Sequence, residues 1–340
     1  MIKKEVTIYD IAHELNVSPS TVSRALRDLP NISKSTKRKI KILADLRGYV
    51  FETEWRRQKL GVIGLIVPHI DTPLTAPIIS GIEQVTSVNG FSITIMETHD
   101  CLENEITFAK SLLEAHVDGL IISPSKETTN LAHFKHFINS DTPIIFLNPL
   151  LEKYNSSAII IDYYTAGYLA TSHLIDQGCH RIAFIGETPM EKTCSKKLKG
   201  YLKALSDHNI LKDENLIVTC ESLDVKEGYE CAGQLLNLSE PPDAVFTEND
   251  DAAVGIIQYA INAGLNVPHD LAVMGFNNDP ISQKIDPPLS TVTFPTIEMG
   301  KIAAQEVVDQ TNFSGIRYAK IINLNANLVI RNSTLKISNP

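Results

Sequence analysis

The 340-residue sequence predicts a small all-α helix-turn-helix headpiece followed by an α/β body of two parallel-sheet lobes. Charge is the first of three observations: residues 1–60 carry 13 Lys or Arg and 7 Asp or Glu, a net charge of +6, against 18 and 33, or −15, in the remainder. This basic segment also shows the apolar spacing of three short helices. From residue 61, short apolar runs alternate with helical patterns, which is typical of a parallel sheet covered on both faces.

Helix start signals place the three helices of the headpiece. Thr7 is suited to cap a first helix, and Ser18 followed by Pro19 is a favourable start for a second. A third helix is predicted from about Ser35 to Arg47. Three short helices with a three- or four-residue turn between the first two are typical of a helix-turn-helix. The side chains predicted to face the core are Ile8, Ile11, Ala12, Leu15, Val22, Ala25, Leu26, Ile40, Leu43, Ala44 and Leu46.

Polar side chains cover the outer face of the second helix. Ser20, Thr21 and Ser23 carry short hydroxyl groups that permit close approach to phosphates, and Arg24 can form two hydrogen bonds with a guanine edge. Composition alone fits a solvated helical bundle equally well.

The residue order decides between these alternatives. The headpiece closely resembles that of the lactose repressor (LacI/GalR) family in the strings Thr7-x-Tyr9-Asp10-Ile11-Ala12, Val17-Ser18-x-Ser20-Thr21-Val22-Ser23-Arg24-Ala25-Leu26, and Ile32-Ser33-x-x-Thr36 followed by Gly48-Tyr49. The resemblance implies that Pro19, Ser20 and Arg24 read bases. It implies that most phosphate contacts come from Thr7, Ser18, Thr21, Ser23, Asn31 and Thr36.

The junction after the headpiece departs from the family pattern. The family carries a short hinge helix with Pro-Asn, then Ala-Arg, then a Leu that enters the minor groove. Here Phe51 and Glu52 replace Pro-Asn, and Trp55 and Gln58 replace the Ala and the Leu, while Arg56 is retained. Three interpretations stay open: Trp55 or Leu60 supplies the wedge, the hinge uses no wedge, or Trp55 packs on the body. The resemblance adds Tyr49, Trp55 and Arg56 to the predicted DNA-binding residues.

The body is predicted to consist of two successive parallel sheets. Strands are predicted at 61–68, 91–96, 119–123, 143–147, 158–161, 181–186, 216–218, 244–246 and 271–276, with helices at about 78–88, 103–114 and 130–139. The family resemblance continues through landmarks such as Asp118-Gly119-Leu120-Ile121, Gly200-Tyr201 and Asn249-Asp250. It implies a periplasmic-binding-protein-like body whose lobes exchange segments near the end of the chain.

That resemblance sets the predicted domain boundaries. Residues 1–60 form the headpiece, with a hinge or linker at about 50–60. Residues 61–162 plus about 293–323 form the first lobe of an effector-binding domain, and residues 163–292 plus about 324–340 form the second.

Ligands of parallel sheets bind beyond the carboxyl ends of the strands. The resemblance places effector contacts at Leu74, Thr75, Ser123, Asp162, Lys197, Asn249 and Asn277. Carboxylates and amides offer paired hydrogen-bonding atoms, which suits vicinal hydroxyl groups. The usual aromatic floor is missing at Leu74, and Lys197 and Asn277 replace an Arg and an Asp. We therefore expect a small sugar or sugar phosphate, with Lys197 favouring an anionic group.

Several classes of protein are disfavoured. There is no run of apolar residues long enough for a membrane span and no hydrophobic signal core, so we expect a cytoplasmic protein without a membrane partner. Five cysteines without a Cys-x-x-Cys pair indicate reduced thiols. His133 and His136 could present two imidazoles, but a solvated helix face is favoured, so we expect no metal and no cofactor. No nucleophile elbow, phosphate loop or dinucleotide fingerprint indicates an enzyme.

The sequence therefore predicts a homodimeric DNA-binding transcriptional regulator, a repressor, whose two headpieces bind a palindromic operator under the control of a carbohydrate-like effector. The alternative is a cytoplasmic sugar receptor without specific DNA readout, which the two lobes alone would suggest.

Overall fold

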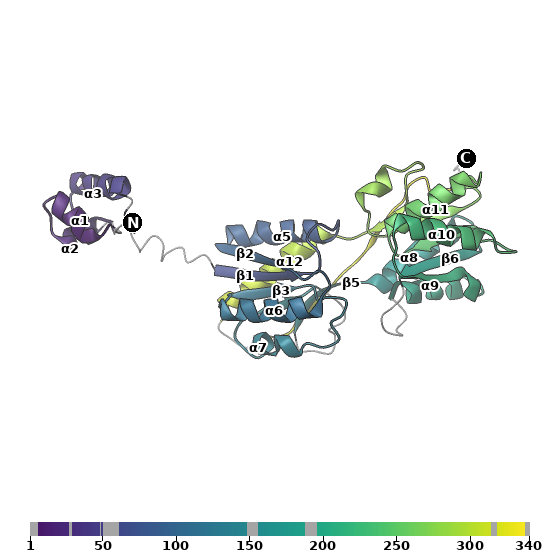
Figure 1. Ribbon diagram of the computed structural model, residues 1–340, viewed down its shortest axis with the longest axis horizontal. Helices are drawn as coiled ribbons and strands as arrows, with labels where there is room; N and C mark the ends of the chain where they lie inside the picture. The colour runs from purple at the N-terminus through teal and green to yellow at the C-terminus, as the bar shows by residue number, and fades with distance from the viewer. Residues whose placement is uncertain are drawn as a thin grey trace. The chain divides into compact units, whose positions relative to one another are not determined.

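The computed structural model describes residues 6–26, 29–47, 49, 61–147, 156–187, 196–313 and 318–336. The chain divides into two compact units, Met1–Gly61 and Val62–Pro340 (Figure 1). The predicted hinge, with Trp55 and Arg56, lies outside the described residues. In the part of the chain that the structure describes, none of the helices combines the length and the apolar character needed to cross a membrane.

The described residues of the first unit form a bundle of three helices: α1 (Ile8–Glu14), α2 (Pro19–Leu26) and α3 (Lys34–Arg47). The predicted N-terminal signals are confirmed. The Asp10 carboxylate accepts hydrogen bonds from the backbone N–H and the hydroxyl of Thr7, and the Ser18 hydroxyl accepts one from the backbone N–H of Thr21. The fully buried core consists of Ile11, Ala12, Val22, Ala25, Ile40 and Ala44.

The prediction that Leu46 faces the core of this unit is wrong. Leu46 is 77% exposed, because it lies about 240° around α3 from Ile40 and therefore off the buried stripe. Tyr49 packs on the core instead, and its backbone N–H donates to the carbonyl of Ala44. An ion pair between Arg47 and Glu14, with 2.7 Å between Nη2 and Oε2, joins α3 to α1.

The second unit contains two parallel sheets, which confirms the predicted fold class. The six-stranded sheet has the order β11-β5-β4-β3-β1-β2, and the four-stranded sheet has the order β7-β6-β8-β9. The strands of the larger sheet are β1 (Gly61–Val67), β2 (Phe91–Glu97), β3 (Gly119–Ile122), β4 (Ile144–Phe146), β5 (Ser157–Ile161) and β11 (Ile321–Leu324). Those of the smaller sheet are β6 (Ile182–Glu187), β7 (Ile217–Cys220), β8 (Ala244–Thr247) and β9 (Ala272–Met274).

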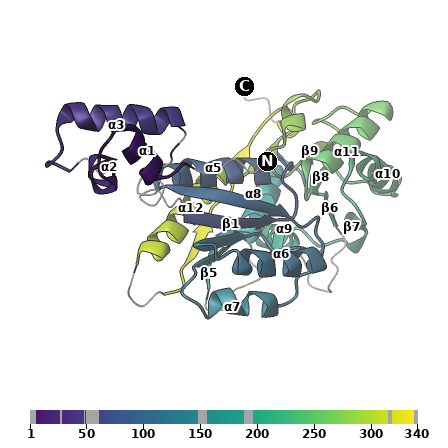
Figure 2. The same ribbon diagram turned by 60° about the vertical axis from the view of Figure 1, so that its left-hand side comes forward.

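Alternating side chains of the six-stranded sheet enter two different cores. Ile63, Leu65 and Val67 of β1 face the helices α5 and α12, whereas Ile66 faces α6 and α7. Figures 1 and 2 show α5 and α6 on opposite faces of this sheet. These helices span Thr75–Val88 (α5), Leu102–Glu114 (α6), Lys135–Ile138 (α7, preceded by the 3₁₀ turn η1, Ala132–Phe134) and Thr296–Asn312 (α12).

The four-stranded sheet is covered in the same way. Phe184 of β6 packs on the side of α8 and α9, whereas Ala183 and Ile185 face α10 and α11. These helices span Tyr163–Asp176 (α8), Lys196–Asp207 (α9), Val225–Leu236 (α10) and Asp250–Asn262 (α11). The remaining elements are the 3₁₀ turns η3 (Glu214–Leu216) and η4 (Pro280–Gln283), and an antiparallel pair of strands, β10 (Thr291–Thr293) and β12 (Asn327–Val329).

Two details of the body differ from the sequence prediction. The predicted buried strand at 91–96 is β2, which lies at the edge of its sheet, so that Ile95 is 38% exposed. The helix predicted at 130–139 is broken into η1 and the single turn α7. Late in the chain, α12 packs on α5 and β3, and β11 pairs in parallel with β5, so these segments belong to the six-stranded sheet.

Candidate nucleic-acid interface and ligand site

Each of two helix N-termini in the first unit carries a cluster of hydroxyl groups. Ser18 Oγ lies 2.8 Å from both Ser20 Oγ and Thr21 Oγ1 at the start of α2. The same Ser-x-Ser-Thr pattern recurs at α3, where Ser33 Oγ lies 3.0 Å from Ser35 Oγ and 2.8 Å from Thr36 Oγ1. Unpaired N–H groups and the helix dipole make such a terminus attractive to phosphate, and the hydroxyls add further donors.

The charge on α3 points to the same kind of partner. Its first turns carry Lys34, Lys37 and Arg38 and no acidic residue. Cations at the positive end of a helix dipole destabilise the helix, typically by about 0.3–1 kcal/mol each. DNA phosphates bound at this end would offset the repulsion between these cations and the helix dipole. The charge pattern of α3 is therefore typical of a helix that binds a polyanion.

The predicted DNA-binding residues of the first unit fall into two groups. Thr7, Ser18, Ser20, Arg24 and Asn31 are exposed. Pro19, Thr21, Ser23, Thr36 and Tyr49 are half-buried.

Tyr9 was not among the predicted contacts, although its side chain is 69% exposed on α1. A large aromatic residue on an otherwise polar helix face was the available signal in the sequence. Its phenol can donate a hydrogen bond to a phosphate oxygen.

Four of the seven predicted effector residues follow a strand, namely Ser123, Asp162, Asn249 and Asn277. Leu74 and Thr75 lie at the start of α5, and Lys197 lies in the first turn of α9. The side chains of Asp162 and Asn249 cap helices. Asp162 follows β5 and accepts hydrogen bonds from the backbone N–H and the hydroxyl of Thr165, at 3.0 and 2.6 Å. Asn249 follows β8, where its Oδ1 accepts from the Ala252 N–H at 2.9 Å and its Nδ2 donates to the Leu223 carbonyl at 2.8 Å. Each of the two side chains keeps acceptor capacity for a ligand, since a carboxylate or amide oxygen has two lone pairs.

Four other predicted residues, Leu74, Thr75, Ser123 and Asn277, have contacts within the protein that do not by themselves indicate a ligand. Leu74 precedes α5 and packs on the apolar core, and Thr75 bonds to the hydroxyl of Thr72. Asn277 follows β9 with φ of 99°, and its backbone N–H donates to the Val292 carbonyl at 2.9 Å. Asn is among the few residues that tolerate positive φ. Ser123 is half-buried beyond the end of β3.

Lys197 has the most distinctive environment of the seven. Its Nζ donates to the backbone carbonyl of Glu248 at 3.0 Å and lies 4.2 Å from the ring centroid of Phe276 and 5.5 Å from that of Tyr163. Burial lowers the pKa of this ammonium group, while the charges of Glu248 and Glu187 act in the opposite direction. The cation is therefore already compensated by protein groups, and a ligand does not have to be anionic to bind beside it.

The structure adds a contact between the two sheets that sequence reasoning missed. Lys126, in the loop after β3, places its Nζ 2.9 and 3.2 Å from the carboxylate oxygens of Glu187 at the end of β6. No sequence pattern pairs residues 61 positions apart. The ion pair places charged groups of both sheets side by side at the carboxyl ends of their strands, where ligands of such sheets bind.

The buried carboxyl group of Asp250, the residue after Asn249, predicts how the free energy of unfolding depends on pH. Asp250 is fully buried, and burial raises its pKa from 3.8 to about 7 despite hydrogen bonds from Thr291 and the Asp279 N–H. Burial, and then the charge of Asp251, raise the pKa of Asp279 to about 6. These groups hold protons in the folded state that the unfolded chain has released. The free energy of unfolding should therefore fall between pH 5 and pH 7, by about 2 kcal/mol from Asp250 alone.

Urea denaturation at pH 5, 6 and 7 checks this slope. Asp250→Asn should flatten it, whatever the variant does to absolute stability, and Asp309→Asn on the exposed face of α12 should leave it unchanged. An unaltered slope in Asp250→Asn would contradict the assignment.

The pair His133 and His136 does not form the solvated helix face that the sequence suggested. His133 is half-buried, and its Nε2 lies 2.7 Å from Oε1 of the fully buried Glu105. Glu105 also accepts hydrogen bonds from Thr128 and the Ser125 N–H. His136 is exposed on α7. His133 therefore satisfies a buried carboxylate.

Comparisons with known proteins match both units. The family model of bacterial regulatory proteins, lacI family, matches residues 7–50, and that of a periplasmic binding protein-like domain matches residues 171–334. The NTD biosynthesis operon regulator NtdR of Bacillus subtilis is 31% identical, over 96% of this chain and 99% of the relative. The lac repressor dimer bound to operator shares the fold, with a TM-score of 0.79 at 22% identity over 98% of this chain and 100% of the other. A LacI family regulator from Enterococcus faecium with bound ribose has a TM-score of 0.69 at 25% identity, covering 82% of this chain and 100% of that one.

Proposed function

We propose that this chain, which belongs to the LacI family of bacterial transcription regulators, is a repressor. A sugar-like effector is proposed to control its affinity for a palindromic operator. The observation that carries the proposal is the basic three-helix unit with hydroxyl groups at the N-termini of α2 and α3. A homodimer would place two such units on two half-sites.

In this proposal α2 enters the major groove of DNA. Arg24 and Ser20 read base edges with Pro19, and the hydroxyl clusters at Ser18 and Ser33 hold phosphates on either side. The remaining predicted contacts with DNA are Thr7, Thr21, Ser23, Asn31, Thr36, Tyr49, Trp55 and Arg56, to which we add Tyr9.

Binding of the purified full-length chain to fragmented genomic DNA from its source tests this function. We expect sequencing of the retained DNA to recover a palindromic site, with an affinity that falls steeply as salt rises. Weak binding without sequence preference, both with and without candidate sugars, would favour the alternative of a sugar receptor that does not read DNA.

The effector is proposed to bind beyond the carboxyl ends of the strands of both sheets. Its contacts would come from Leu74, Thr75, Ser123, Asp162, Lys197, Asn249 and Asn277. Paired oxygen and nitrogen atoms at Asp162, Asn249 and Asn277 suit the vicinal hydroxyls of a sugar, and an absent hydroxyl would leave them buried and unpaired. Since Glu187 and Glu248 compensate Lys197, a neutral sugar fits this environment as well as a phosphorylated one.

Replacing Lys197 by Met should separate the two functions. The variant keeps an apolar stem on Phe276 but removes the hydrogen bond to the Glu248 carbonyl and the positive charge beside the Glu248 side chain. We expect sugar affinity to fall at least about tenfold, the equivalent of about 1.4 kcal/mol, with operator affinity in the absence of sugar unchanged.

Calorimetry with ribose, cellobiose and glucose 6-phosphate measures the first effect and fluorescence anisotropy with operator DNA the second. Ribose is the first probe because it is bound in the Enterococcus faecium regulator. Lys199→Met, at an exposed position of the same helix, is the matched control. Equal sugar affinity in the Lys197 and Lys199 variants would remove Lys197 from the proposed site.

A further inference from the structure

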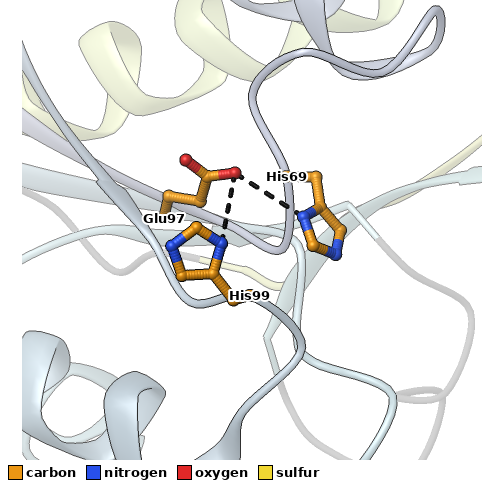
Figure 3. A group of neighbouring side chains, drawn as sticks. All are labelled: His69, Glu97 and His99. Carbon is orange, nitrogen blue, oxygen red and sulfur yellow. Dashed lines mark ion pairs between the residues drawn. The ribbon is translucent and has the colours of Figure 1, made fainter.

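A cluster of two histidines and a glutamate, none of which is among the seven residues assigned to the effector, lies at the carboxyl ends of β1 and β2 in the six-stranded sheet. His69 follows β1, Glu97 ends β2, and His99 lies two residues beyond it. Figure 3 shows the Glu97 carboxylate between the two imidazole rings. The distances are 3.6 Å from Glu97 Oε1 to His69 Nδ1 and 3.5 Å to His99 Nδ1. One ligand atom from each residue lies within 4.8 Å of the other two.

We propose that His69, Glu97 and His99 bind a divalent transition-metal ion of the zinc class. In a tetrahedral zinc site the ligand atoms lie about 2.1 Å from the metal, so that they are about 3.4 Å from one another. Two of the three ligand separations in the cluster already have this value. The third is at most 4.8 Å and would shorten on rotation of the His99 side chain, which is 66% exposed.

The backbone holds the three ligands in place. β1 and β2 are neighbours in the sheet, and their pairing continues past the strand ends, where the Thr98 and His99 N–H groups each donate at 2.9 Å to the carbonyls of Val67 and Pro68. The Glu97 carboxylate is itself oriented by the Ile70 N–H at 3.2 Å. The ends of two adjacent strands thus bring the three side chains together, although His69 and His99 lie 30 positions apart in the sequence.

A fourth residue completes the arrangement expected of a metal site. Asp100 Oδ2 lies 3.4 Å from His69 Nε2, the ring nitrogen that faces away from the proposed ion. Carboxylates at this position hold a metal-bound imidazole in the correct tautomer and raise its basicity. Asp100 is fixed in turn by the Lys126 N–H, which donates to its other oxygen at 3.1 Å.

The ligand set selects the class of ion. Two imidazoles and one carboxylate suit zinc and related transition metals, whereas magnesium and calcium prefer oxygen ligands alone. Solvent reaches all three side chains, which are 41%, 26% and 66% exposed for His69, Glu97 and His99. Three protein ligands with an open fourth position for water describe such a site.

Calorimetric titration of the untagged, full-length, metal-free chain with Zn²⁺ tests the proposal, and the visible spectrum with Co²⁺ reports the coordination geometry. We expect one ion per chain and a tetrahedral Co²⁺ spectrum. Asp100→Asn should weaken binding by about 10–100-fold. His69→Ala and His99→Asn should weaken it further and abolish the spectrum; Asn is chosen because His99 has φ of 54°, which Asn tolerates.

His136→Ala removes an exposed histidine of the same lobe and should change nothing. The variants alter partly exposed side chains, and circular dichroism verifies that they fold. The proposal is overturned if the wild type binds no Zn²⁺ at millimolar concentration, if His69→Ala and His99→Asn bind as the wild type does, or if Mg²⁺ competes equally with Zn²⁺.

Discussion

Arg24→Ala is expected to cost about 1–3 kcal/mol of operator binding, or about 5- to 150-fold in Kd, and to relax sequence preference at one base pair of each half-site. The residue is exposed on α2, three residues after Thr21 of the hydroxyl cluster, where a helix in the major groove presents side chains to base edges. The bidentate fork of an Arg distinguishes guanine from other bases. Loss of that fork removes discrimination as well as affinity.

Lys34→Ala supplies the contrast. Lys34 is the first residue of α3, beside the Ser33 hydroxyl cluster that is proposed to hold a phosphate, so we expect its ammonium group to contact phosphate as well. Its loss should weaken binding to every DNA sequence to a similar extent and reduce the slope of log K against log salt by about 1. Neither side chain is buried, so both variants should keep the fold of the headpiece.

Anisotropy titrations of the two variants against the operator and its single-base variants, at four salt concentrations, distinguish the two behaviours. If Arg24→Ala loses affinity equally for all sequences and flattens the salt slope, Arg24 is a phosphate contact and base reading lies elsewhere on α2. If neither variant changes binding, the headpiece does not dock through α2.

Elements with strong local signals could be predicted from the sequence. The apolar runs at β1, β3 and β5 and the capping residues Thr7 and Ser18 lie where the pattern placed them, because burial on both faces and helix capping leave local traces. The edge position of β2 was missed, although its apolar residues alternate with Ser92 and Thr94, a pattern typical of a strand with one face exposed rather than of a doubly buried strand. Strands β10 and β12 are three residues each and pair across more than thirty residues.

In the candidate sites too, features with a local signal could be predicted from the sequence, whereas contacts between distant residues could not. Residues at strand ends could be named as candidates because chain order fixes which edge of a parallel sheet they reach. Their partners could not, because the contacts of Lys197 with Phe276 and of Lys126 with Glu187 span 79 and 61 positions. The cluster of His69, Glu97 and His99 was missed for the same reason: its members approach one another only when β1 and β2 pair.

Gly228→Ala should lower the free energy of unfolding by about 3 kcal/mol, near the upper end of the usual cost of overpacking. A methyl group built at Gly228 on α10 would lie 2.2 Å from the Ala252 carbonyl oxygen and 2.7 Å from its Cα, both on the backbone of α11. Those atoms cannot rotate away, so the helices must separate. Gly255 makes the reciprocal approach, with 2.0 Å from its built methyl to the Val225 carbonyl oxygen.

The same close approach of a helix backbone to a glycine occurs where α5 meets α12, at Gly81 and Gly300, and where α8 meets α9, at Gly167 and Gly200. One of these glycines, Gly200, stood among the family landmarks in the sequence, but only the structure shows that each of them admits a helix backbone. Close crossing at paired glycines fixes the distance between the covering helices on one face of the six-stranded sheet and on both faces of the four-stranded sheet. It thereby helps to fix the positions of the strand ends that carry the proposed effector contacts.

Gly233→Ala, five residues further along α10, is the matched control. Its methyl would meet only the Tyr259 side chain, at 3.0 Å, and a side chain can shift. The gain of about 1 kcal/mol in helix propensity should offset that contact. Gly228→Ala should therefore lower Tm by at least about 5 °C, whereas Gly233→Ala should change it little. Thermal unfolding followed by circular dichroism measures both values. Equal Tm values would mean that α10 and α11 separate at little cost, and that the glycine pairs do not fix the strand ends.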